Sequence, residues 1–202
     1  GLLGSAYDAD SDGVEGKYYV FTYDEIKDLE DIENYFEIKP EGNWEKKIIL
    51  VEKEKPNKEI IKKLLNIRSK RTKPFFDDKT QLDLNCLWIS SLVAASEILP
   101  EEGYLNLAEE FFLKIEKKYI DRNIYHSYSK DIVFIEDYAF LINSLIDLSD
   151  KTMNFKYKDL ARKLSSEAID KFFLNDKNIF QKNPKNNNDI FLNPIDIGDN
   201  TI

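Results

Sequence analysis

Hydrophobic and polar positions divide the chain into two parts of different character. From about residue 56 onward, apolar residues recur every three or four positions, a spacing that places them on one side of an α-helix. Prolines, glycines and polar clusters interrupt this pattern and mark the ends of the helices. The spacing predicts five helices, over residues 56–72, 83–99, 103–119, 136–149 and 155–173.

The predicted helices alternate between two kinds of surface. Those over 83–99 and 136–149 are apolar almost all round, whereas those over 56–72, 103–119 and 155–173 carry charged residues along one side. A helix that is apolar all round has to be enclosed, while an amphipathic helix can face water. Successive hairpins of one enclosed and one exposed helix build a double ring, whereas in a simple bundle every helix is amphipathic. The pattern therefore predicts a mainly α fold, a partial α/α toroid.

The residues before position 56 predict a small β-containing segment. Aromatic and β-branched side chains over 17–22 predict one strand, and residues 47–51 predict a second. Thr22 and Glu25 have the spacing of a capping box, which predicts a short helix over 23–30.

We expect residues 1–55 to be an acidic loop and small β-containing segment of the same barrel domain to which the hairpins of residues 56–202 belong. The chain opens on Gly1-Leu2-Leu3-Gly4 and ends within a polar loop. We therefore expect a fragment, with the barrel truncated at both ends.

A run of four carboxylates and two glycines lies at residues 8–16. Acidic, glycine-rich loops that lead into a strand are common places for functional sites. The run resembles the start of an EF-hand calcium loop, but Tyr19 stands where the bidentate glutamate would be. We therefore predict no metal site and no cofactor, and we expect Asp8 and Asp10 to bind substrate.

Composition excludes some classes of function. The net charge of −9 argues against nonspecific binding of nucleic acid, because phosphates repel an acidic surface. No apolar run approaches the ~20 residues needed to span a bilayer. The single cysteine, Cys86, lies in an apolar stretch and is more typical of a core residue than of a nucleophile. The absence of a disulfide framework fits a reducing compartment and predicts a cytoplasmic protein.

Acidic residues stand before, or at the start of, both predicted inner helices. Asp77, Asp78, Lys79 and Asp83 precede or open the first, and Glu136 and Asp137 open the second. The inner helices of a toroid run parallel, so that their N-termini gather at one end of the central cavity. Carboxylates that converge there can accept hydrogen bonds from hydroxyl groups or exchange protons with a sugar, and aromatic rings such as Trp88 can stack on it.

This pattern assigns the candidate site. We predict acid/base roles for four acids, Asp77, Asp78, Glu136 and Asp137, and substrate binding by five further residues, Asp8, Asp10, Lys79, Asn85 and Tyr138. The alternative is that the acids only cap their own helices or face solvent. The one histidine, His126, could act as a general base, but a surface or packing role is the more common one.

Short motifs in a fixed order also give the chain a family resemblance. It resembles the thioredoxin-domain-containing protein family that includes spermatogenesis-associated protein 20 and its bacterial relatives. The matching motifs are Asp8-Ala9-Asp10-Ser11, Glu15-Gly16-Lys17-Tyr18-Tyr19-Val20, Tyr35-Phe36, Gly42-Asn43-Trp44-Glu45, Arg68-Ser69-Lys70-Arg71, Pro74, Asp77-Asp78-Lys79, Asn85-Cys86-Leu87, Ile135-Glu136-Asp137-Tyr138-Ala139-Phe140-Leu141 and Pro194-Ile195-Asp196 with Asp199.

The resemblance implies a thioredoxin-like domain before this chain, and a barrel similar to N-acylglucosamine 2-epimerases and six-hairpin glycosidases. Asp83-Leu84-Asn85-Cys86 stands where the family has Ser-Trp-Asn-Gly, which removes a stacking ring and adds bulk at a helix start. Three functions therefore compete: a barrel that binds, isomerises or hydrolyses a carbohydrate; a non-catalytic scaffold for protein partners; and a redox enzyme whose chemistry lies in the thioredoxin-like domain.

Overall fold

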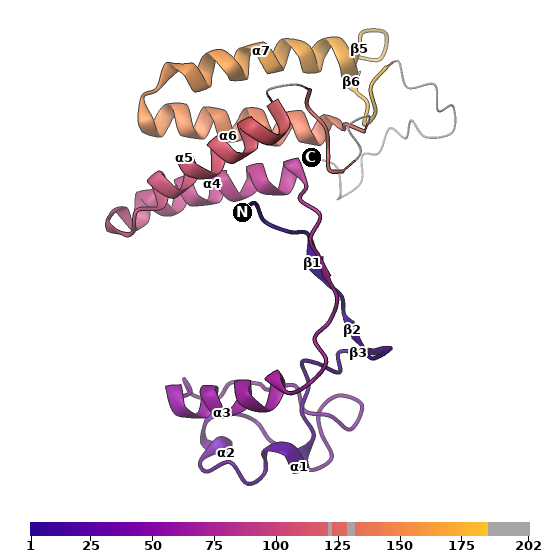
Figure 1. Cartoon of the computed structure of the whole chain (residues 1–202), viewed down its shortest axis with the longest axis vertical. Coiled ribbons are helices and arrows are strands. Elements are labelled where there is room, and N and C mark those ends of the chain that lie inside the picture. Colours follow the sequence, from indigo (N-terminus) through magenta and orange to yellow (C-terminus); the bar gives the residue numbers. More distant parts are fainter. Residues whose placement is uncertain (121–122, 129–131, 186–202) are drawn as a thin grey trace. The chain divides into compact units, whose positions relative to one another are not determined.

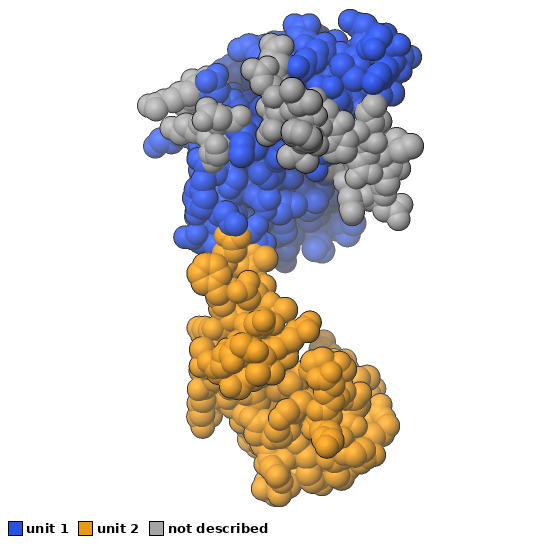
Figure 2. Space-filling model, turned by 90° about the vertical axis from the view of Figure 1, so that its right-hand side faces the viewer, with its two compact units in different colours: residues 1–5, 78–202 blue, residues 6–77 orange. Residues whose placement is uncertain are grey.

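The computed structural model describes residues 1–120, 123–128 and 132–185. These residues form two compact units, which are shown in different colours in Figure 2. One unit consists of residues 6–77, and the other of residues 1–5 with residues 78 onward. The motif Pro194-Ile195-Asp196 with Asp199 lies outside the described residues.

Four long helices build the second unit: α4 (Leu82–Ile98), α5 (Tyr104–Ile115), α6 (Ile135–Thr152) and α7 (Phe155–Phe172). Helices α4 and α6 run in one direction, and α5 and α7 return in the other (Figure 1). Helix α4 packs against α5 and α6, and α6 packs against α7. The predictions of a mainly α fold and of helical hairpins are confirmed, and this is the packing order of successive inner and outer helices in an α/α toroid.

The alternation in burial is confirmed as well. Helices α4 and α6 bury more residues than α5 and α7 do, as the pattern of apolar positions predicted. In α4 and α6 the buried residues are Leu82, Asn85, Cys86, Ile89, Leu92, Val93 and Ser96, and Asp137, Tyr138, Leu141, Ser144, Leu145, Leu148 and Ser149. In α5 and α7 they are Ala108, Phe111, Phe112 and Ile115, and Ala161, Leu164, Ala168 and Phe172.

One face of α4 is apolar and exposed nevertheless. Leu84, Leu87 and Trp88 lie on the side opposite the buried residues, and Trp88 is 37% exposed. Helices α5 and α6 cover the other sides of α4. The Trp88 ring therefore lies on an open helix face, and the structure gives it no enclosing cavity wall among the described residues of this unit.

Cys86 is a core residue, as predicted. Its side chain is fully buried between the helices, and burial raises the pKa of its thiol. Two short elements close the helical hairpins, the 3-10 turn η1 (Pro100–Glu102) and the π-helical turn η2 (Glu116–Ile120). The hairpin of β5 (Phe173–Leu174) and β6 (Ile179–Phe180) follows α7. None of the helices in the described part of the chain combines the length and apolarity that crossing a bilayer requires.

The unit of residues 6–77 has its own small core. It contains α1 (Tyr23–Ile26), α2 (Ile32–Tyr35) and α3 (Lys58–Ser69), with β1 (Ala6–Tyr7) paired to β4 (Phe76–Asp77) and β2 (Asp10–Ser11) paired to β3 (Val14–Glu15). The core residues come from its loops and helices: Phe21, Ile26, Ile32, Phe36, Ile48, Ile60 and Leu64.

The first compact unit ends at residue 77, because Ile60 and Leu64 of α3 pack into its core. The expected division of one barrel domain into residues 1–55 and 56–202 stays a prediction. The capping box of Thr22 and Glu25 is confirmed, although α1 ends at Ile26. The strands predicted over 17–22 and 47–51 are wrong: only isolated bridges form there, among them the one between Phe21 and Ile48.

Arg71 explains why residues 17–20 form turns. Its guanidinium donates to the carbonyl oxygens of Tyr18 and Val20 at 2.9 and 2.5 Å, and to Glu25 Oε1 at 2.9 Å. It also lies over the Phe21 ring, 4.7 Å from the centroid. In a strand, the carbonyls of Tyr18 and Val20 would accept from a neighbouring strand, but here the planar guanidinium of Arg71 binds both.

We predict that Arg71→Lys lowers the free energy of unfolding of this unit by roughly 2 kcal/mol, because an ammonium group cannot bind these acceptors together. Urea unfolding followed by Trp44 fluorescence in a Trp88→Phe background measures this. Arg68→Lys is the control, since Arg68 contributes a cation–π contact with Tyr18. Equal transitions for the two variants would contradict the role of Arg71.

Candidate functional site

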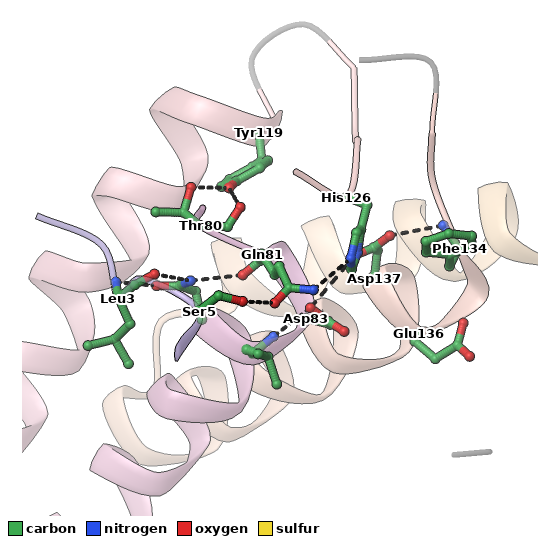
Figure 3. A network of polar contacts seen from close by, with 12 residues as sticks. Leu3, Ser5, Thr80, Gln81, Asp83, Tyr119, His126, Phe134, Glu136 and Asp137 are labelled. Carbon is green, nitrogen blue, oxygen red and sulfur yellow. Dashed lines mark hydrogen bonds and ion pairs between the residues drawn. The ribbon is translucent and has the colours of Figure 1, made fainter. Parts of the chain in front are cut away.

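The starts of α4 and α6 lie at the same end of the helical unit and bring two acids to one histidine. Asp83 lies in the first turn of α4 and Asp137 in the first turn of α6. Between them lies His126, from the loop that precedes α6, as Figure 3 shows. Asp83 and Asp137 therefore meet at one end of the helical unit.

Backbone contacts hold the loop of residues 123–128 in place. The Leu82 N–H donates to the His126 carbonyl at 2.9 Å, and the His126 N–H donates to the Ile132 carbonyl at 2.8 Å. The Tyr125 hydroxyl donates to the Lys118 carbonyl at 2.9 Å, and the rings of Tyr125 and Tyr119 pack together. The loop is therefore fixed both to the start of α4 and to the π-helical turn η2.

Each ring nitrogen of His126 has a polar partner. Nδ1 lies 2.9 Å from Asp137 Oδ1, and Nε2 lies 3.0 Å from the Gln81 side-chain nitrogen. Gln81 Oε1 accepts a hydrogen bond from the Ser5 hydroxyl at 2.5 Å, so its amide nitrogen is the atom turned to the ring. This network fits a neutral imidazole in which Nδ1–H donates to Asp137 and Nε2 accepts from Gln81.

Asp137 is a fully buried carboxylate with two hydrogen-bond donors. Oδ1 faces His126, and Oδ2 accepts from the Phe134 N–H at 2.9 Å. Burial raises the pKa of Asp137, and the hydrogen bonds from Phe134 and His126 oppose that rise. The N-terminus of α6 also favours a negative charge at this position.

Asp83 is the second carboxylate of the cluster. Its Oδ1 accepts from the Leu84 N–H at 2.8 Å and lies 3.9 Å from His126 Nδ1. Its side chain is 18% exposed, as is that of His126, whereas Asp137 is enclosed. Asp83 and His126 are therefore the members of the cluster that a ligand can reach.

Two more of the predicted acids belong to the helical unit. Asp78 Oδ1 accepts a hydrogen bond from the Tyr128 hydroxyl at 2.8 Å, two residues after His126. Glu136 precedes Asp137, and its Oε2 is buried without a hydrogen-bond partner among the described residues. Its other oxygen lies 4.0 Å from Lys182 Nζ. Lys79 belongs to the same unit.

Asn85 and Tyr138 have partners in the core instead. The Asn85 side chain accepts from the Leu3 N–H at 2.8 Å and donates to the carbonyls of Gln81 and Leu3. Tyr138 is fully buried, where its ring packs on Phe172. Neither presents a free face to a substrate in this structure, because core packing set the direction of both side chains.

The remaining predicted residues belong to the unit of residues 6–77. Asp10 lies opposite Glu15 in the β2–β3 pair, Asp77 lies opposite Ala6 in the β1–β4 pair, and the Asp8 N–H donates to Phe75. Their part in a common site stays a prediction.

Sequence reasoning undervalued His126 and left Asp83 out of the site. The signals were present: His126 is the one histidine of the chain, and Asp83 opens an inner helix. What the sequence could not supply was the long-range pairing, since Gln81 and His126 are 45 positions apart.

The cluster also has the donors of a possible cation site. One ligand atom from each of Asp83, His126 and Asp137 lies within 4.8 Å of the others. Nitrogen and carboxylate donors suit Zn²⁺, Mn²⁺ or Fe²⁺. A cation would have to replace the Nδ1 proton of His126, so the protonation of that nitrogen decides between the two chemistries.

Comparison with known proteins gives limited information. No protein-family model matches the chain, and no curated protein matches it. Among solved structures, it is similar to the cellobiose 2-epimerase from Bacillus thermoamylovorans B4167, with 21% identity and a TM-score of 0.45. The match covers 52% of this chain and 29% of that one. A likeness of this extent carries no argument about activity.

We predict that neutral His126 carries its proton on Nδ1, whereas free histidine prefers Nε2–H. Because the chain has one histidine, its ¹⁵N-coupled proton spectrum above pH 8 reports this ring alone. A protonated Nδ1 and an unprotonated Nε2 are expected, and Asp137→Asn should shift the proton to Nε2. A wild-type ring protonated on Nε2 would contradict the assigned network.

Proposed function

We propose that the helical unit carries an acid/base site for a sugar or related polyol, with His126 as the group that transfers the proton. The observation that carries the proposal is the pair of His126 Nδ1 and buried Asp137 Oδ1 at 2.9 Å, beside the accessible Asp83. A carboxylate on Nδ1 fixes the tautomer in which Nε2 can accept a proton.

Each neighbour has a role in this proposal. Asp137 orients the imidazole and stabilises the imidazolium that forms when Nε2 takes a proton. The Gln81 side-chain nitrogen now lies 3.0 Å from His126 Nε2, and a substrate hydroxyl or C–H group would take its place. Asp83, which is 18% exposed, would accept a hydrogen bond from a hydroxyl of the sugar. Asp78, which accepts from the Tyr128 hydroxyl, and Glu136, whose Oε2 is buried without a hydrogen-bond partner among the described residues, would supply further acceptors for hydroxyl groups.

Isomerisation fits the geometry better than hydrolysis. Glycosidases place two carboxyl groups ~5–10 Å apart on either side of the scissile bond. Ligand atoms of Asp83 and Asp137 lie within 4.8 Å of each other and share His126, which leaves no room for a glycosidic bond between them. A histidine that removes a proton next to a carbonyl needs no such gap.

The family resemblance extends the proposal beyond this chain. It would place the site in a barrel of the six-hairpin type, in a protein with a thioredoxin-like domain. The scaffold alternative is favoured by the same burial of Asp137, since a buried acid that accepts from Phe134 also closes the start of α6. The two alternatives differ in whether His126 exchanges protons with a ligand.

We predict that the chain catalyses exchange with solvent deuterium of the C2 proton of an aldose or of a C1 proton of a ketose, measured by NMR over a panel of monosaccharides and disaccharides. His126→Ala should abolish the exchange, and Asp137→Asn should slow it by about 10²–10⁴-fold. Asp78→Asn and Glu136→Gln should weaken sugar binding or turnover and leave the fold intact.

Controls separate chemistry from stability. Asp150→Asn changes an exposed acid on α6, far along the helix from its start, and should leave the rate unchanged. Circular dichroism checks that each variant is folded. Exchange that requires added Mn²⁺ or Zn²⁺ would assign the cluster to a cation, and a folded wild type without exchange on any sugar would favour the scaffold.

A further inference from the structure

A concave site lies wholly within the unit of residues 6–77. The cavity measures about 450 Å³, which is within the range of small-molecule sites. Its apolar lining comes from Val14, Val20 and the Trp44 ring, and charged side chains surround these. The helical unit contributes no residue to it.

Three separate segments meet at this cavity. They are residues 14–25, the hairpin turn of Trp44–Lys47, and Arg71 just after α3. Each contains residues of a motif that carries the family resemblance, and the acid/base site of the helical unit uses none of them. The fold thus brings together residues of three motifs that the acid/base site does not use.

The backbone of Gly16 supports the Trp44 ring. A β-carbon placed on Gly16 would lie 3.4 Å from both Cη2 and Cζ3 of Trp44, so the ring lies against a residue that has no side chain. Gly16 has φ of +69°, a conformation that glycine adopts without strain. The ring is therefore supported on the protein side and still lines the cavity.

The hairpin turn beside Trp44 contains residues that do not favour its left-handed backbone conformation. Glu45 and Lys46 have φ of 47° and 59°, and Trp44 and Lys47 exchange backbone hydrogen bonds of 3.1 and 2.7 Å across the turn. Asn-Gly is the sequence that such a two-residue turn prefers. Left-handed backbone at ordinary residues is found preferentially at functional sites. Here it places the Glu45 side chain at the cavity.

The charges around the cavity balance. Three acids, Glu15, Glu25 and Glu45, face three bases, Lys17, Lys47 and Arg71. Glu25 and Arg71 bind each other at 2.9 Å, and Lys17 binds Asp12 at 2.8 Å.

The other three charged groups have no such partner. Glu15, Glu45 and Lys47 form no side-chain hydrogen bond or ion pair with any residue of the described part of the chain. Two carboxylate acceptors and one ammonium donor are therefore available beside the Trp44 ring. Because their charges largely balance those of the other lining residues, the cavity does not favour an ion of either sign, whereas the hydroxyl groups of a sugar can donate and accept hydrogen bonds together.

We propose that this cavity binds a neutral sugar ring. The apolar face of a pyranose stacks on Trp44, and its hydroxyls donate to Glu15 and Glu45 and accept from Lys47. This site is distinct from the acid/base site, and it binds glycosides whose anomeric carbon is blocked as well as free sugars.

Trp44 fluorescence tests the proposal directly, because the chain has two tryptophans and the other, Trp88, lies in the other unit. In a Trp88→Phe variant of the whole chain, methyl glucoside, methyl galactoside or β1,4-linked methyl disaccharides should shift the emission with saturation. These blocked glycosides cannot isomerise, so their binding succeeds or fails independently of the proposed turnover. A flat response to every glycoside would overturn the proposal, as would saturation by tetramethylammonium or phosphate alone.

Rim variants test the assigned contacts. Glu45→Gln and Lys47→Met should weaken binding about three- to tenfold, whereas Glu52→Gln, which lies outside the cavity, should leave it unchanged. The double change Glu45→Asn with Lys46→Gly gives the two-residue turn the Asn-Gly sequence that it prefers. It should raise the melting temperature and still weaken binding. Unweakened binding by that folded variant would overturn the role of Glu45.

Discussion

The parallel course of α4 and α6 is the constraint on which the helical unit depends. Two inner helices that start at the same end bring the charges of their first turns together, and both N-termini favour negative groups there. Asp83 and Asp137 are those groups, and His126 lies between them. Each carboxylate has its own hydrogen-bond donor there, because His126 Nδ1 lies 2.9 Å from Asp137 and the Leu84 N–H donates to Asp83 at 2.8 Å.

Burying Asp137 is costly, and its hydrogen bonds offset much of that cost. A buried carboxylate without hydrogen-bond donors would take up a proton or move out of the core. Here one oxygen accepts from the Phe134 backbone and the other from His126, so both are satisfied. The same two bonds fix the direction of the imidazole, with Nε2 turned to Gln81. A contact needed for folding thus also prepares a group for proton transfer.

The periodicity of apolar residues predicted the elements that depend on local sequence. Helices α4 to α7 occur within a few residues of the predicted ranges, because burial of an apolar stripe is encoded every three to four positions. The turn at residues 17–20 was not predicted, because Arg71, some 50 residues later, binds its carbonyls. Tyr138 and Asn85 were expected to bind substrate, but the Tyr138 ring packs on Phe172 and the Asn85 side chain is hydrogen-bonded to the Leu3 backbone. His126 was undervalued because its partners come from other elements, and only the fold shows them.

If His126 and Asp137 act as one unit rather than as two independent side chains, their contributions to stability are coupled. A double-mutant cycle of His126→Ala and Asp137→Asn measures this coupling. Unfolding in urea at neutral pH is followed by Trp88 fluorescence in a Trp44→Phe background. We expect a coupling free energy of about 1.5–3 kcal/mol between the two residues. Additive effects, with a coupling near zero, would contradict it.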